Sequence, residues 1–269
     1  PEPFATSSLQ QEASNKLGMS PKTTMSLAQE LYEKGKITYM RTDLKKLSQE
    51  AKDEIKEKVD KEFGEEYYQD NIIKSKSDNS QEAHEACRPT NFEEFTLEED
   101  RNISSRANRL YKLIWTRTMM SQMKPAEVEV TNIKIYVKNG EEVEKYYFVS
   151  KKEFILFDGF LILNNYNKFS TEDEEESDDI EIDVNKEDLK KIKENLVLDY
   201  KDITAQQKYS RHSQGRFTEA SLIKKMDDLG IGRPSTYATM ISNVQDREYT
   251  IKKTEEGEEK ECLKLYLQN

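Results

Sequence analysis

The residues best suited to chemistry lie in one short segment, Ile37–Asp43. If this segment is extended, alternate side chains face together, which places Tyr39, Arg41 and Asp43 on one side. A phenol with a pKa of about 10 is ionised in about one molecule in a thousand at pH 7. An adjacent guanidinium favours the phenolate and also binds phosphate through several donors. The pairing suits a tyrosine that attacks a phosphodiester, although the chain has 14 Tyr and a structural role is the ordinary one.

A second polar group lies at the turn between two predicted helices near the end of the chain. The first helix opens at Thr218, and the second is predicted to begin at Pro234. Because helix N-termini favour anions, Arg233, Ser235 and Thr236 at this turn are suitable phosphate ligands. The alternative is an ordinary helical hairpin in which the hydroxyl side chains only cap a helix. The pattern alone leaves both interpretations open.

Other catalytic and metal-binding patterns are absent from the sequence. It contains no Walker A motif, no G-x-G-x-x-G, no H-E-x-x-H and no G-x-S-x-G. His84 and Cys87 lie three residues apart, but no further ligands lie near them, so no metal site is predicted. Two cysteines and two histidines cannot form a disulfide framework, and they indicate a reducing, intracellular compartment.

The net charge of −11 is concentrated in one place. Residues 171–187 hold ten acidic residues and one Lys, which accounts for −9 and leaves −2 for the rest of the 269-residue chain. A nucleic-acid partner is therefore not excluded, and any basic surface must be local. The acidic run is typical of a solvated loop. The mean hydropathy is −0.94. No apolar run approaches the roughly 20 residues of a membrane span, so we expect a cytoplasmic protein.

The elements that must position these residues fall into regions that we take as domains. Residues 1–125 are predicted to be helical, with helices capped by Ser20 and Ser48 and a third from about Arg101. Residues 126–200 are predicted to form antiparallel sheet, because β-branched and aromatic runs are separated by Asn-Gly and Asp-Gly turn signals. These runs are 128–137, 145–150 and 160–166.

Residues 201–269 are predicted to be helical again. Two helices are followed by strand-like runs at 249–253 and 262–268, which is the outline of a winged helix-turn-helix. The order of helices, then sheet, then helices favours separate domains over a doubly wound fold. The predicted fold class is therefore multi-domain α+β.

Four stretches resemble the signature motifs of type IA DNA topoisomerases, in the order of that family. They are PFATSSLQQEA (Pro3–Ala13), ITYMRTD (Ile37–Asp43), EAHEACRPT (Glu82–Thr90) and RFTEASLIKKMDDLGIGRPSTYATMISNVQDREY (Arg216–Tyr249), with FDGFL (157–161) as a lesser match. The resemblance implies a helical domain that bears the tyrosine, a β-rich arch or hinge domain, and part of a single-strand-binding domain, in an open toroid-forming arrangement. Leu44, Cys87 and Glu248 depart from the usual Ser, Ile and Gly, which leaves the subfamily open.

The resemblance also implies an activity and roles for residues. Such enzymes cut one DNA strand by tyrosine attack, hold it through a 5′-phosphotyrosyl link, pass a strand and reseal the break, which relaxes negative supercoils without ATP. By similarity Tyr39 is the nucleophile, Arg41 orients it and steadies the phosphate, and His84 contacts DNA near the cut. The matching single-strand-binding positions are Arg216, Arg233, Ser235, Thr236 and Arg247.

The family's Mg²⁺ is bound by a Toprim domain whose motifs should precede Pro3 and are not in this sequence. We therefore expect a fragment that binds no metal itself, whose partners are single-stranded segments of supercoiled DNA and the Toprim domain of the same polypeptide. The acidic run 171–187 is no substitute, because carboxylates in a loop are not an ordered Mg²⁺ site. The alternatives are a non-catalytic DNA-binding module with a winged helix-turn-helix-like region and a structural adaptor.

Overall fold

The structure of the chain is a computed structural model. It describes residues 1–71, 85–98, 100–139, 142–167, 189, 191–194, 196–197, 202–207, 215–254, 259 and 261–268. His84 and the acidic run 171–187 therefore lie outside the described residues. The described elements form a mixed α+β protein with two small antiparallel sheets, which confirms the predicted class at that level.

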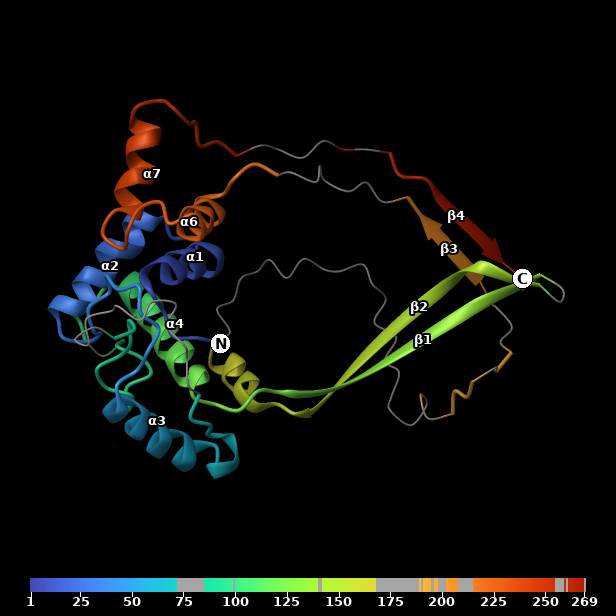
Figure 1. Ribbon diagram of the computed structural model, residues 1–269, viewed down its shortest axis with the longest axis horizontal. Helices are drawn as coiled ribbons and strands as arrows, with labels where there is room; N and C mark the ends of the chain where they lie inside the picture. The colour runs from blue at the N-terminus through green and yellow to red at the C-terminus, as the bar shows by residue number, and fades with distance from the viewer. Residues whose placement is uncertain are drawn as a thin grey trace.

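Helices gather at one end of the molecule, and a long β-hairpin leads away from them (Figure 1). The α-helices are α1 (Thr6–Leu17), α2 (Pro21–Glu33), α3 (Gln49–Glu62), α4 (Ser105–Ser121), α6 (Glu219–Asp228) and α7 (Tyr237–Asp246). The strands are β1 (Glu127–Asn139), β2 (Glu142–Phe157), β3 (Asp202–Gln206) and β4 (Lys264–Gln268), and the 3₁₀ segments are η1 (Glu65–Tyr67) and η2 (Gly159–Asn167). No helix among the described residues is long and apolar enough to cross a membrane.

The helices α2, α3 and α4 begin where a serine side chain satisfies a free backbone N–H group. The Ser20 hydroxyl accepts from the Thr23 N–H at 3.2 Å and the Ser48 hydroxyl accepts from the Ala51 N–H at 3.3 Å, as the sequence predicts. The third helix was expected from about Arg101, but α4 begins at Ser105 because Ser104 is its cap. The helix α1 was not singled out from the pattern.

One large hydrophobic core holds this region together. It is built from α1, α2, α3 and α4 together with apolar residues of the segments between them, and Trp115 and Tyr111 of α4 are almost completely buried in it. The polar atoms of both side chains are hydrogen-bonded. The Trp115 indole donates to the Phe92 carbonyl at 3.0 Å, and the Tyr111 hydroxyl donates to the Glu94 carbonyl at 2.8 Å. This core is the rigid base for the segments between the helices.

The second region confirms the predicted antiparallel pairing of its first two runs. β1 and β2 form a hairpin in which Ile133 lies opposite Ser150 and Tyr136 lies opposite Tyr147. Apolar side chains on both strands are exposed, including Tyr146 of β2 at 79%. A two-stranded ribbon without a covering layer has little core of its own.

The prediction of a strand at 160–166 is wrong. These residues form the 3₁₀ segment η2, which packs against α4 and buries Leu163 in the main core. Gly159 sits in the left-handed region with φ 49°, where an added Cβ would lie 2.5 Å from the Lys124 carbonyl oxygen. The run is apolar because it covers a helix, and a short apolar run does not by itself distinguish strand from helix.

The last region returns to the first by two helices. α6 packs against α1, and α7 packs against α2 (Figure 1). The winged part of the prediction is not formed: β4 pairs with β3, with Thr204 opposite Tyr266, at the far end of the molecule from α6 and α7. The run 249–253 forms no strand. The pairing partner of β4 comes from before α6, which local pattern could not reveal.

Candidate functional site

Backbone hydrogen bonds join three segments that are far apart in the sequence, beside the candidate nucleophile. The Cys87 N–H donates to the Phe4 carbonyl at 2.9 Å, and the Thr6 N–H donates to the Thr42 carbonyl at 2.8 Å. On the other side, the Thr38 N–H donates to the Arg88 carbonyl at 2.8 Å. Each of these three segments is therefore bonded to the other two, which brings together the described parts of the quoted blocks, 3–13, 37–43 and 85–90.

Two threonine hydroxyls fix the backbone on either side of Tyr39. The Thr6 hydroxyl donates to the Met40 carbonyl at 2.7 Å and accepts from the Thr42 N–H at 2.9 Å, all of it buried. The Thr38 hydroxyl donates to the Ala86 carbonyl at 2.8 Å. Each such bond contributes about 0.5–1.5 kcal/mol, and leaving a buried partner unpaired costs more.

The burial of side chains along this segment alternates. Met40, Thr42 and Leu44 are buried. Tyr39, Arg41 and Asp43 are exposed. The alternation agrees with the prediction that these three side chains share one side, although only Ile37 makes a ladder bridge and the segment is no regular strand. The packing beneath presents a phenol, a guanidinium and a carboxylate to solvent.

Tyr39 is 40% exposed on this surface. Its ring lies against the ring of Tyr32, with centroids 5.3 Å apart and the planes at 65°, an edge-to-face contact. Within the described part of the chain, its hydroxyl has no hydrogen-bond partner. Tyr32 was not among the predicted site residues.

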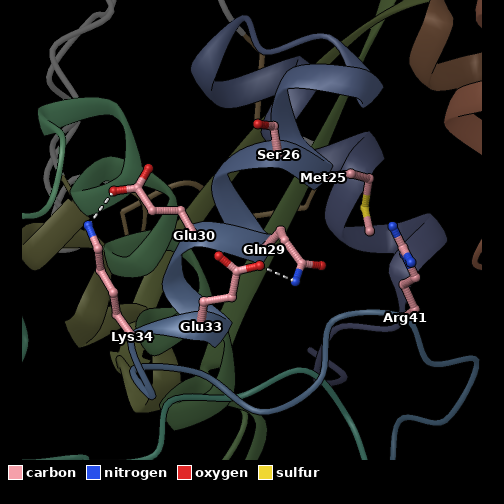
Figure 2. Close-up of a pocket in the computed structure, with 7 residues that line it drawn as sticks. All are labelled: Met25, Ser26, Gln29, Glu30, Glu33, Lys34 and Arg41. Atoms are coloured by element: carbon pink, nitrogen blue, oxygen red, sulfur yellow. Dashed lines mark hydrogen bonds and ion pairs between the residues drawn. The ribbon is translucent and has the colours of Figure 1, made fainter.

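Arg41 lines a groove of about 510 Å³ along the outer face of α2. Figure 2 shows the guanidinium at one end of the groove beside Met25 and the pair of Glu30 and Lys34 at the other end. The Lys34 ammonium and the Glu30 carboxylate form an ion pair at 2.9 Å, and the Gln29 amide donates to the Glu33 carboxylate at 2.8 Å. Among the described residues Arg41 makes no ion pair, so its donors are available to an anion.

The segment 85–90 has a supporting role in the described geometry. Arg88 binds Glu85 through two nitrogens, at 2.9 and 3.0 Å. Burial raises the pKa of the Cys87 thiol to about 12, so this buried thiol is neutral at neutral pH. The described residues contain no group of three His, Cys, Asp or Glu side chains placed to hold a metal ion.

The predicted phosphate ligands of the last region are only partly together. Arg233, Ser235 and Thr236 are exposed in one tight turn, whereas Arg216 precedes α6 and Arg247 follows α7. The span of α7 alone puts Arg247 about 15 Å from Thr236. All five are exposed.

The turn itself differs from the prediction at its helix start. α7 begins at Tyr237 rather than at Pro234, because the Arg233 carbonyl accepts from the Thr236 N–H at 2.8 Å and closes a turn first. The Arg233 N–H in turn donates to the Thr236 hydroxyl at 2.8 Å, and the Arg233 guanidinium donates to the Gly232 carbonyl at 2.6 Å. Some of the donors expected to be free are therefore engaged within the turn.

A carboxylate joins this turn to the tyrosine-bearing region. Asp227 of α6 accepts from the Ser7 hydroxyl of α1 at 2.9 Å and from the Tyr237 hydroxyl at 2.9 Å. Burial, and then the bond to Asp227, raise the pKa of Tyr237 to about 12, with a smaller contribution from Asp43. The sequence analysis does not predict this joint. The feature that could have indicated it is that Ser7, Asp227 and Tyr237 all lie inside the blocks that resemble the family.

Comparison with known proteins finds one family in common. A family model described as DNA topoisomerase matches residues 1–261. The chain is 45% identical to "DNA topoisomerase 1 type prokaryotic" of Acanthamoeba polyphaga mimivirus over 92% of this chain and 28% of that protein. It is 42% identical to DNA topoisomerase 1 of Rickettsia bellii over 92% of this chain and 30% of that protein.

A solved structure is similar as well. Full-length topoisomerase I from Thermotoga maritima superimposes with a TM-score of 0.65 at 34% identity, over 93% of this chain and 38% of that one. The chain thus spans about a third of the proteins that it matches. It belongs to the bacterial-type (type IA) DNA topoisomerase I family.

Proposed function

We propose that this chain is the part of a type IA DNA topoisomerase that carries the nucleophile, Tyr39, and a single-strand-binding surface on α6 and α7. As part of a longer protein it cuts one strand through a 5′-phosphotyrosyl intermediate, lets a strand pass and reseals the break. The outcome is relaxation of negative supercoils without ATP. Family membership supports the reaction class, and the site geometry supports the residue roles.

The observation that carries the proposal is how Tyr39 and Arg41 are presented. Both side chains point to solvent from a backbone that the hydroxyls of Thr6 and Thr38 fix on both sides. A nucleophile held in place ahead of the reaction lowers the barrier, because phosphoryl transfer depends mainly on positioning and charge stabilisation.

The chemistry assigned to this chain is a balanced exchange of phosphodiester bonds. The Tyr39 oxygen gives up its proton and bonds to phosphorus, and the bond from phosphorus to the 3′-oxygen breaks. The 3′-oxygen takes a proton and leaves as a hydroxyl, while the 5′ end remains on the tyrosine. Arg41 binds the non-bridging oxygens as charge develops. Resealing is the reverse reaction.

Mg²⁺ is expected from the family, but the described residues do not fit it. They include no cluster of three candidate ligands near Tyr39 or elsewhere. No step is therefore assigned to a metal on this chain, and we propose that the ion belongs with the Toprim domain.

We propose that single-stranded DNA runs along α7 and reaches Tyr39 across the joint at Asp227. Arg233, Ser235 and Thr236 bind backbone phosphates at the start of α7, and Arg216 and Arg247 extend this surface. His84 contacts DNA near the cut. In the sequence it precedes Cys87 by three positions, and the Cys87 N–H donates to the Phe4 carbonyl. The runner-up, a DNA-binding module without chemistry, is less favoured because β4 forms no wing beside α7.

The test is Tyr39→Phe in a protein that also contains the Toprim domain. We expect DNA cleavage and relaxation to be lost and single-strand binding to be retained, because phenylalanine keeps the ring and removes only the nucleophilic oxygen. Tyr146→Phe is the matched control, since this side chain is 79% exposed on β2. Relaxation that survives in Tyr39→Phe would remove Tyr39 from the mechanism.

A further inference from the structure

The side chain that meets the candidate nucleophile is another tyrosine. The ring of Tyr32 contacts that of Tyr39 edge to face, with centroids 5.3 Å apart. Both residues are about equally exposed, at 41% and 40%. The contact is therefore a surface feature next to the reacting oxygen and not part of the hydrophobic core.

Tyr32 itself is held by the end of α2. Its carbonyl accepts from the Gly35 N–H at 2.8 Å, and the Leu31 carbonyl accepts from the Lys36 N–H at 2.9 Å. Gly35 has a φ of 68°, the left-handed value that lets the chain turn back at once. The two tyrosines lie seven positions apart in the sequence, and this closed turn fixes the backbone of one relative to the other.

The charged neighbours of Tyr32 on α2 are engaged with one another. Glu30 pairs with Lys34 at 2.9 Å, and Glu33 accepts from Gln29 at 2.8 Å. Within the residues that the structure describes, neither the Tyr32 hydroxyl nor the Tyr39 hydroxyl has a hydrogen-bond partner. Among the described residues, the ring contact is thus an interaction of the Tyr39 side chain itself, whereas the threonine hydroxyls bind only the neighbouring backbone.

We propose that Tyr32 is a positioning residue for DNA cleavage, whose ring selects the orientation in which the Tyr39 oxygen faces the scissile phosphate. The inference rests on the proposed role of Tyr39. In-line attack needs the reacting oxygen in one direction, and a side chain that samples several rotamers presents it less often. The ring of Tyr32 carries this role and its hydroxyl does not, so phenylalanine should replace it and alanine should not.

The first arm of the test needs neither DNA nor a Toprim domain. In the 269-residue chain with ¹³C-labelled tyrosine rings, the Tyr39 signals are assigned by their loss in Tyr39→Phe. Tyr32→Ala should shift these signals because the neighbouring ring current is gone. Tyr32→Phe and the exposed control Tyr146→Ala should leave them in place. Unshifted Tyr39 signals in Tyr32→Ala would overturn the inference.

The second arm measures cleavage in a single turnover with the Toprim domain and Mg²⁺ supplied. At saturating DNA, Tyr32→Ala should lower the cleavage rate about two- to twelvefold, which corresponds to the roughly 0.5–1.5 kcal/mol of an aromatic pair. Its dissociation constant for single-stranded DNA and its melting temperature should stay at wild-type values, and Tyr32→Phe should restore the rate.

The outcomes separate the two claims. If Tyr39→Phe still forms a covalent adduct, the proposed function is wrong. If Tyr39→Phe is inactive and Tyr32→Ala cleaves like the wild type, only the role of Tyr32 is wrong. If Tyr32→Phe lowers the cleavage rate as much as Tyr32→Ala, the hydroxyl and not the ring carries the effect. If Tyr32→Ala weakens DNA binding and leaves the cleavage rate unchanged, Tyr32 is a DNA contact. Either of these results also overturns the inference.

Discussion

The tyrosine-bearing region and the α6–α7 pair are both helical, yet they are held together in different ways. The first has a core to which α1, α2, α3 and α4 all contribute. The second has four buried hydrophobic residues that pack as a cluster: Ile223, Met226, Tyr237 and Ile241. So small a cluster supplies little stability of its own. The helices α6 and α7 therefore owe their order to docking on α1 and α2, through a joint centred on Asp227.

The largest effect should come from the core of the first region. Trp115→Ala removes a side chain that is 1% exposed and also loses its bond to the Phe92 carbonyl. We expect a loss of about 3–5 kcal/mol in the free energy of unfolding, measured by chemical denaturation. Tyr146→Ala on the exposed hairpin is the control and should change it by less than about 0.5 kcal/mol. A small effect of Trp115→Ala would mean that the first region is not the independently stable one.

The second largest effect is expected at the joint between α6 and the tyrosine-bearing region. Asp227→Ala removes the acceptor for both Ser7 and Tyr237. The expected cost is about 1–3 kcal/mol, confined to the docking of α6 and α7. Hydrogen exchange should therefore show about 5- to 160-fold less protection in these two helices and unchanged protection in α4. Equal loss in α4 would show that the two regions unfold as one unit, which would contradict the comparison.

A pH titration sharpens the same point. The folded state raises the pKa of Tyr237 to about 12, from an ordinary value of 10, through burial and the bond to Asp227. The folded state therefore favours the neutral phenol, so this contribution to docking is complete below pH 10 and is lost as the pH rises from 10 to 12. A phenolate absorbance titration of wild type minus Tyr237→Phe should show a single group near 12. A difference curve centred near 10 would place Tyr237 in solvent.

The smallest effect should be at the surface of α7. Arg233→Ala leaves the small cluster untouched and removes one cation from the proposed phosphate-binding turn. We expect weaker single-strand binding and a log–log salt dependence shallower by about 0.7, measured by fluorescence anisotropy at several salt concentrations. Lys253→Ala, beyond α7, is the control for general loss of charge. An unchanged slope in Arg233→Ala would favour the ordinary helical hairpin.

The same contrast shows what could be predicted from sequence. Local rules predict the caps at Ser20, Ser48 and Thr218 and the β1–β2 pairing, and the structure agrees with each. They also predict that Tyr39, Arg41 and Asp43 share one side, which agrees with the alternating burial of this segment. Features that depend on distant partners were missed. The run 160–166 is helical because it meets α4.

The joint at Asp227 was missed for the same reason. It links Ser7 with a residue 220 positions further along the chain, and no periodicity records such a contact. The pairing of β4 with β3 spans the two helices α6 and α7 in sequence. The contact between the rings of Tyr32 and Tyr39 depends on how tightly the chain turns at Gly35. The glycine indicates a turn in the sequence, but it does not specify the geometry of that turn.

The central claim is that Tyr39 bonds covalently to the 5′ end of a cut strand, and covalent trapping tests it most directly. The chain is mixed with single-stranded DNA labelled at the 5′ or the 3′ end, with Mg²⁺ and a separately made Toprim domain, and then denatured. A 5′-phosphotyrosyl link retains the part of the DNA that lies 3′ of the cut. We therefore predict an adduct that carries the 3′ label and is absent in Tyr39→Phe. An adduct that carries the 5′ label, or one that persists in Tyr39→Phe, would contradict the account.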